Sequence, residues 1–143
     1  MRSSNGAIGC YDLCCGAGIL SLGFMHAGFK LLGGIDIDQS AIETVSANLS
    51  SGEWERMSIE RLAKDLKNGS SHPILHAGIL LACLPCQGFS VAGKRDPDDE
   101  RNTLYRHLLR VAKQVKPKII VFENVRGLQA ARNKSTYVSL LRG

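Results

Sequence analysis

The sequence predicts an α/β fold in which a doubly wound, mostly parallel sheet is covered by helices on both faces. Segments with strand character alternate with segments of helical periodicity, and the predicted strands are apolar throughout, as expected for strands buried on both faces. Polar residues also follow several of these strands directly. The length of 143 residues suits one domain with one hydrophobic core.

The first predicted strand, residues 6–13, leads into a glycine-rich turn. Residues 15–18, with the sequence CGAG, form this turn, and apolar residues then recur with helical spacing over 19–27. Gly28 can end this helix because glycine tolerates the left-handed backbone of a helix C-terminus.

The second predicted strand, residues 30–37, is also followed by a helix. Asp38 can cap that helix, in which Ile42, Val45 and Leu49 fall on one face. Residues 50–77 carry a weaker pattern, in which the spacing of apolar residues over 59–66 indicates a helix.

The second half of the chain continues the alternation. Residues 79–82 predict a short buried strand, and residues 88–101 predict a mobile polar surface loop. Apolar spacing over 104–115 predicts a helix that ends before Pro117, and residues 119–122 predict another buried strand. A last helix is expected from about residue 135.

Four polar residues lie at or just beyond the carboxyl ends of the predicted strands and are the first candidates for a functional site. They are Asp12, Asp36, Cys86 and Glu123. In open parallel sheets, ligands bind outside the carboxyl ends of the strands. We therefore expect these four side chains to share one edge of the sheet.

Net charge and composition limit the partners and the cellular location that we expect for this protein. The net charge of +5 is compatible with a polyanionic partner. No apolar run approaches the roughly 20 residues that span a bilayer, and the N-terminus lacks the apolar segment of a signal peptide. We expect a cytoplasmic protein without a membrane partner, in which the five cysteines are thiols, ligands or nucleophiles.

The glycine turn and the acid after the second strand indicate a nucleoside cofactor. Gly16 and Gly18 permit a tight turn and close approach of the backbone to a ligand, and the carboxylate of Asp36 can accept hydrogen bonds from ribose hydroxyls. The dinucleotide fingerprint G-x-G-x-x-G is incomplete, because Ser21 stands where its third glycine belongs. A nucleoside without a pyrophosphate, such as S-adenosylmethionine, fits better.

Cys86 is the candidate nucleophile, since a thiolate is the strongest nucleophile among ordinary side chains. Three alternatives remain: a redox pair with Cys83, a zinc site that adds Cys14 or Cys15, or simple packing. Among these alternatives, we do not expect the zinc site.

Glu123 offers two interpretations, because a carboxyl at the end of a buried strand is costly without a partner or a task. One is a salt bridge with Lys118 or Arg126, and the other is an acid with a raised pKa.

Several segments together resemble the C5-cytosine-specific DNA methyltransferases. DLCCGAG (12–18) resembles their cofactor motif, GIDIDQSAIETVSAN (34–48) their second motif and PCQGFS (85–90) their catalytic motif. RNTLY (101–105) and KPKIIVFENVRGL (116–128) resemble the next two. The order and spacing are also similar, and the resemblance covers most of residues 8 to 130.

The resemblance implies a Rossmann-like class I methyltransferase fold, S-adenosylmethionine as cofactor, and double-stranded DNA with a flipped cytosine as substrate. It implies that Cys86 attacks C6 of the cytosine, that Glu123 contacts its N3 and N4 edge, that Asp36 holds the ribose and that Ile37 packs on the adenine. The implied cofactor residues are Asp12, Cys14, Gly16, Ala17, Gly18, Asp36, Ile37 and Leu104. The implied DNA contacts are Pro85, Gln87, Ser90, Lys94 and Arg95.

The sequence also departs from the family pattern. Cys14 replaces a usual Phe, Asp36 a frequent Glu and Cys83 a common Gly, and either Ser58 or Asp65 takes the place of the acid that contacts the adenine amino group. Residues 1–143 contain no target-recognition domain and none of the family's C-terminal motifs. We therefore expect a catalytic half that is a fragment or one subunit of a split enzyme. The alternatives are a non-catalytic subunit that needs a partner chain, and a tRNA cytosine methyltransferase.

Overall fold

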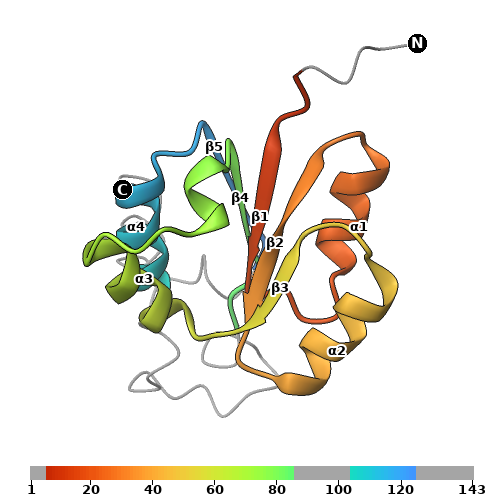
Figure 1. The fold of residues 1–143 in the computed structure, drawn as a ribbon, viewed down its shortest axis with the longest axis horizontal. Coiled ribbons are helices and arrows are strands. Elements are labelled where there is room, and N and C mark those ends of the chain that lie inside the picture. Colours follow the sequence, from red (N-terminus) through yellow and green to blue (C-terminus); the bar gives the residue numbers. More distant parts are fainter. Residues whose placement is uncertain (1–5, 86–103, 125–143) are drawn as a thin grey trace, which may run out of the picture.

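The computed structural model describes residues 6–85 and 104–124, which form a parallel five-stranded sheet (Figure 1). The strands lie in the order β3-β2-β1-β4-β5, and each neighbouring pair is parallel. Their bounds are β1 Gly9–Leu13, β2 Lys30–Asp36, β3 Glu53–Arg56, β4 Ile79–Ala82 and β5 Ile119–Phe122. The chain reverses its direction of winding after β3, which confirms the doubly wound α/β prediction.

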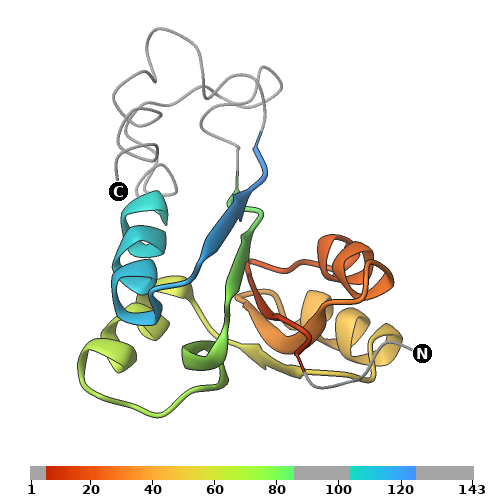
Figure 2. The ribbon, with the colours of Figure 1, turned by 90° about the horizontal axis from the view of Figure 1, so that it is seen from above.

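Helices cover the sheet on both faces, as Figures 1 and 2 show. The helices α1 (Ile19–His26) and α2 (Gln39–Asn48) lie on one face. The helices α3 (Ile59–Lys67) and α4 (Leu104–Val115), with the short 3-10 helix η1 (Pro73–His76), lie on the other. Among the described helices, none is long and apolar enough to cross a bilayer.

The central strand β1 divides its side chains between two hydrophobic clusters, because neighbouring residues of a strand point to opposite faces. Tyr11 and Leu13 belong to the cluster beneath α3 and α4, whereas Cys10 belongs to the cluster beneath α1 and α2. All three are almost completely buried. This burial makes β1 the rigid centre from which the following turn projects.

The helix ends follow ordinary capping chemistry. The carboxylate of Asp38 accepts a hydrogen bond from the backbone N–H of Ser40 at the start of α2, as the sequence predicts. The hydroxyl of Ser58 accepts one from the N–H of Arg61 at the start of α3. Helix α4 is followed by Lys116 in a left-handed conformation and then by Pro117.

The sequence analysis did not predict the 3-10 helix η1 or the edge strand β3. The sequence of β3 is Glu-Trp-Glu-Arg, and its charged side chains are exposed, so it lacks the apolar run of a buried strand. Trp54 anchors it: the indole lies over Gly34, where a Cβ atom would approach it to 2.7 Å, and its Nε1–H donates to the carbonyl of Leu49.

The prediction of a buried strand at residues 119–122 is correct in position and wrong in burial. Ile119 is 51% exposed and Ile120 is 39% exposed. The strand β5 is an edge strand of the described sheet, and α1 and α2 cover the opposite half of their face. The loop expected at 88–101 and the helix expected from about 135 lie outside the described residues.

Substituting Gly18 tests how the turn after β1 is seated. Gly18 has a φ of +83°, and a Cβ atom there would overlap Cγ2 of Val45 on α2. We expect Gly18→Ala to lower the free energy of unfolding by about 2–4 kcal/mol, the sum of left-handed strain and overpacking. Urea denaturation of the single variant, and of the same change in a Val45→Ala background, measures the coupling.

Gly16→Ala is the matched control, because Gly16 is also left-handed, with a φ of +52°, but has no atom within 4 Å of the position that a Cβ would take. Its expected cost is about 1 kcal/mol of strain alone. Equal losses for the two variants would contradict the packing role of Gly18.

Candidate active site

The carboxyl ends of four parallel strands place the predicted site residues at one edge of the sheet. Leu13 at the end of β1 pairs with Ile35 of β2 on one side and with Ala82 of β4 on the other. Ala82 in turn pairs with Phe122 of β5. The residues that follow these strands therefore lie side by side, as the alternation of strands and helices predicts.

The carboxylate of Asp36 holds the glycine turn in place. Its Oδ2 accepts a hydrogen bond from the N–H of Gly16 at 2.9 Å, and its Oδ1 accepts one from the N–H of Asp38 at 3.0 Å. The N–H of Cys15 donates to the carbonyl of Ile35, which ties the same turn to β2. A carboxylate has about four acceptor positions, so Asp36 keeps capacity for a ligand.

The two turn glycines serve different purposes. A Cβ atom at Gly16 would point into open space, whereas one at Gly18 would meet α2. The backbone is therefore open to a ligand at Gly16 and at the exposed Ala17, while Gly18 is required for packing. Sequence reasoning treated both glycines alike because the contact with α2 is tertiary.

Asp12 is a buried carboxyl with one unpaired oxygen. The side chain is 1% exposed, and its Oδ2 accepts a hydrogen bond of 2.6 Å from the hydroxyl of Ser21, which is also buried. Its Oδ1 is buried without a hydrogen-bond partner among the described residues. Burial raises the pKa of Asp12 to about 6, against the lowering effect of the Ser21 hydrogen bond, and Asp36 adds to the rise.

The neighbours of Asp12 carry no compensating positive charge in the part of the chain that the structure describes. Besides Asp36, the titratable groups that interact with Asp12 are the phenol of Tyr11 and four thiols. Burial raises the pKa of Tyr11 well above its ordinary value and the pKa values of the thiols to about 11 or 12, so all five groups are neutral at neutral pH. These thiols are Cys10, Cys14, Cys15 and Cys83. A buried carboxylate without a positively charged partner favours a positively charged ligand and disfavours a pyrophosphate.

The redox and zinc alternatives receive no support from the described cysteines. Burial, with the charges of Asp12 and Glu123, raises the pKa of Cys83 to about 11, which makes it a poor attacking thiol. Within residues 6–85 and 104–124, no three His, Cys, Asp or Glu side chains are grouped to hold a metal ion. Cys86 lies outside these residues.

Glu123 is exposed, although it directly follows a strand that the sequence predicts to be buried. Burial cannot make it costly here, and within the described chain it forms no ion pair with Lys118. Its backbone is nevertheless fixed at the edge, since its N–H donates to the carbonyl of Ala82 at 3.1 Å. The side-chain amide of Asn124 donates to the carbonyl of Leu84 at 3.5 Å, in the segment that leads to Pro85.

The remaining cofactor candidates differ in their surroundings. Ile37 is 66% exposed directly after Asp36, so its apolar side chain is accessible to a ligand that binds beside this carboxylate. Cys14 is partly buried and has a φ of +60°. Leu104 begins α4 and packs partly buried against the cluster beneath that helix.

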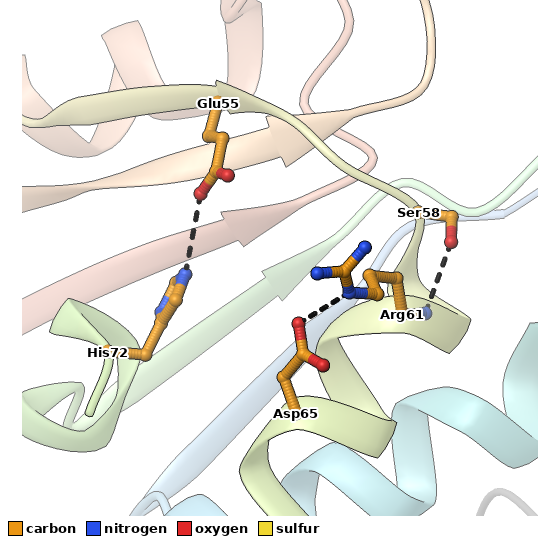
Figure 3. Close-up of polar contacts among 5 residues, drawn as sticks. All are labelled: Glu55, Ser58, Arg61, Asp65 and His72. Atoms are coloured by element: carbon orange, nitrogen blue, oxygen red, sulfur yellow. Dashed lines mark hydrogen bonds and ion pairs between the residues drawn. The ribbon is translucent and has the colours of Figure 1, made fainter. Parts of the chain in front are cut away.

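The structure separates the two candidates for the adenine amino group, as Figure 3 shows. Ser58 lies two residues after the end of β3 and caps α3. It is close to the carboxyl edge of the sheet, because Arg56 at the end of β3 pairs with Asp36. Asp65 lies two turns along α3, where its carboxylate pairs with Arg61 at 2.7 Å. Position therefore favours Ser58, although its role remains a prediction.

Five of the predicted site residues lie outside the described part of the chain. They are Cys86, Gln87, Ser90, Lys94 and Arg95, and Pro85 is the last described residue before them. The sequence analysis did not identify two residues at this edge. It noted Ser21 only as the residue in place of the third glycine, and it assigned no role to Asn124. For Ser21 a signal was available: it lies three residues beyond Gly18, on the buried face of the helix.

An apolar groove of about 490 Å³ runs along α1 beside this edge. Ile19, Leu20, Gly23, Phe24, Ala27 and Phe29 line it, together with Cys83 and Glu123. The lining residue Ile19, which directly follows the glycine turn, is 80% exposed.

Comparisons with known proteins identify relatives over nearly the whole chain. A family model described as C-5 cytosine-specific DNA methylase matches residues 8–142. The type II methyltransferase M.XorII of Xanthomonas oryzae pv. oryzae is 40% identical over 124 residues, which are 86% of this chain and 29% of that protein. M.Sau96I of Staphylococcus aureus is 37% identical over 82% of this chain and 27% of its own length.

Solved structures show the same fold. A protein described as a DNA modification methyltransferase, encoded within a prophage (E. coli), superposes with a TM-score of 0.75 at 27% identity, over 95% of this chain and 37% of that one. Spodoptera frugiperda DNMT2 superposes with a TM-score of 0.67 at 20% identity, over 95% of this chain and 41% of that one. The fold is that of the class I S-adenosylmethionine-dependent methyltransferases.

The raised pKa of Asp12 predicts a stability cost that depends on pH. Between the ordinary carboxyl value and about 6, the native state binds the proton more tightly than the unfolded chain, so stability falls as the pH rises through this range. Asp12→Asn cannot ionise, so its stability relative to the wild type should rise by about 1–3 kcal/mol between about pH 4 and pH 7.5. Urea denaturation at both pH values measures the difference.

Glu43→Gln, which removes an exposed carboxyl on α2, controls for net charge and should show little change with pH. A pH-independent difference between Asp12→Asn and the wild type would show that Asp12 ionises normally.

Proposed function

Because the chain belongs to the C-5 cytosine-specific DNA methylase family, we propose that it carries the cofactor-binding and catalytic residues of a DNA cytosine-5 methyltransferase. One observation supports this proposal beyond the family: the glycine turn, Asp36, Pro85 and Glu123 meet at the carboxyl edge of one parallel sheet. Each comes from a segment that resembles a different motif of the family.

S-adenosylmethionine is the cofactor that the residues at this edge fit. Asp36 has acceptor capacity for ribose hydroxyls, Ile37 offers an exposed apolar surface to an adenine ring, and Gly16 leaves room beside the backbone. The negative charge of Asp12 suits a cationic sulfonium and ammonium better than a pyrophosphate. Cys14, Ala17, Gly18 and Leu104 complete the proposed cofactor residues. When bound, the cofactor supplies an electrophilic methyl group.

The proposed substrate is a cytosine flipped out of double-stranded DNA. The thiolate of Cys86 adds to C6, which makes C5 nucleophilic, and Glu123 binds the N3 and N4 edge and favours protonation at N3. After methylation, a base takes the proton from C5, the electron pair of the C5–H bond re-forms the 5,6 double bond, and the C6–S bond breaks to release Cys86 as a thiolate. The exposed carboxyl of Glu123 is compatible with direct contact to a base. Pro85, Gln87, Ser90, Lys94 and Arg95 are the proposed contacts to the DNA.

The chain spans between 27% and 31% of the length of the first three curated relatives. The proposed methylation activity therefore belongs to a protein in which the rest of the family's length is also present. That remainder is either joined to these residues or supplied by a second chain. Without it, the function proposed for the chain reduces to binding the cofactor.

Calorimetric titration of S-adenosylmethionine into the chain tests the cofactor part. Gly16→Ala should lower the affinity at least about tenfold, because the added methyl group enters space that the ligand requires. Gly28→Ala is the matched control: Gly28 is also left-handed and surrounded by open space, but it lies beyond the other end of α1. Equal affinities for the two variants would place the ligand elsewhere.

Covalent capture on DNA tests the nucleophile. In duplex DNA with 5-fluorocytosine in place of cytosine, fluorine replaces the proton that must leave, so the adduct to C6 should persist on a denaturing gel in the presence of cofactor. Cys86→Ala should abolish the adduct, and Cys83→Ala should retain it. An adduct that survives in Cys86→Ala would exclude Cys86 as the nucleophile. A chain that binds cofactor and forms no adduct would indicate that the rest of the family's length is needed.

A further inference from the structure

Ser21 connects helix α1 to the central strand through a buried hydrogen bond. Its hydroxyl donates to Oδ2 of Asp12 at 2.6 Å, and both side chains are at most 1% exposed. This length is typical of a hydroxyl that donates to an ionised carboxylate. A glycine at this position, as in the dinucleotide fingerprint, would leave both oxygens of Asp12 without this donor.

We propose that Ser21 is a positioning residue, whose hydroxyl holds one oxygen of Asp12 so that the other is directed to the positively charged part of S-adenosylmethionine. This inference rests on the proposed function and extends it to a residue that does not itself touch the cofactor. The free oxygen is sealed from bulk solvent, so its charge is weakly screened and acts strongly on a nearby cation, directly or through a bound water.

Among the described groups that face Asp12 from each neighbouring element, the Ser21 hydroxyl is the one that stabilises its charge. Cys10 and Tyr11 lie on the same strand, Cys14 and Cys15 in the turn and Cys83 beyond β4. The four thiols and the Tyr11 phenol are all neutral at neutral pH. Asp36, the last residue of β2, is the charged neighbour and repels the carboxylate. Ionisation of Asp12 therefore depends on the Ser21 hydroxyl until a cation is bound.

Burial and the Ser21 hydrogen bond shift the pKa of Asp12 in opposite directions, which determines how the loss of Ser21 should affect cofactor affinity. The Ser21 hydrogen bond lowers the pKa of Asp12, so Ser21→Ala should raise it above about 6. More of the carboxyl is then protonated near neutral pH, and affinity for the cationic cofactor should fall roughly threefold to tenfold there. At alkaline pH the carboxyl ionises again, and the affinity should recover.

The experiment measures S-adenosylmethionine affinity of the chain from slightly acidic to alkaline pH. The wild type should lose affinity as the pH falls through about 6, Ser21→Ala should lose it at a higher pH, and Asp12→Asn should bind weakly at every pH. Ser46→Ala, an exposed serine on α2, should follow the wild type. Carbon NMR of labelled aspartate side chains gives the pKa of Asp12 directly and needs no cofactor.

Two results overturn the proposal in distinguishable ways. If Ser21→Ala lowers affinity equally at all pH values and leaves the pKa of Asp12 unchanged, Ser21 is only a structural link between α1 and β1. If the wild type binds no cofactor at any pH, the cofactor part of the proposed function fails, and the positioning role fails with it.

Discussion

The two hydrogen bonds accepted by Asp36 are the constraint on which the candidate site depends. One carboxylate binds the N–H of Gly16 in the turn after β1 and the N–H of Asp38 at the start of α2. The turn and the helix are thereby fixed to the end of the same strand, and Gly18 can pack closely against Val45 only because they are. The residue that we propose to bind the ribose also holds the backbone of the site, so a substitution of Asp36 would change folding and binding together.

The main elements of the fold could be predicted from the sequence, because buried strands and amphipathic helices are marked by their own residues. The segment Ile79–Ala82 is apolar throughout, and α3 places Ile59, Leu62 and Leu66 on one buried face. The strand β3 could not be predicted, because it is stabilised by Trp54 over Gly34, a contact between residues of two different strands. Local periodicity does not carry that information.

The positions of the candidate site residues could be predicted from the sequence, whereas the burial of their side chains could not. Parallel strands bring their carboxyl ends together whatever the side chains are, so Asp12, Asp36 and Glu123 had to share an edge. The burial of Asp12 and the exposure of Glu123 depend on which helices cover each strand, and this is decided by tertiary packing. Burial of the Asp12 carboxylate also lowers the stability of the fold, and such costs are common at functional sites.

The groove along α1 has a consequence for how the chain behaves among its own copies. In the described part of the molecule, the apolar side chains of Ile19 and Phe24 line a depression beside β5, an edge strand whose Ile119 and Ile120 face solvent. Apolar surface next to an edge strand favours association between molecules, because one copy can cover the groove of another while strands pair along the edge.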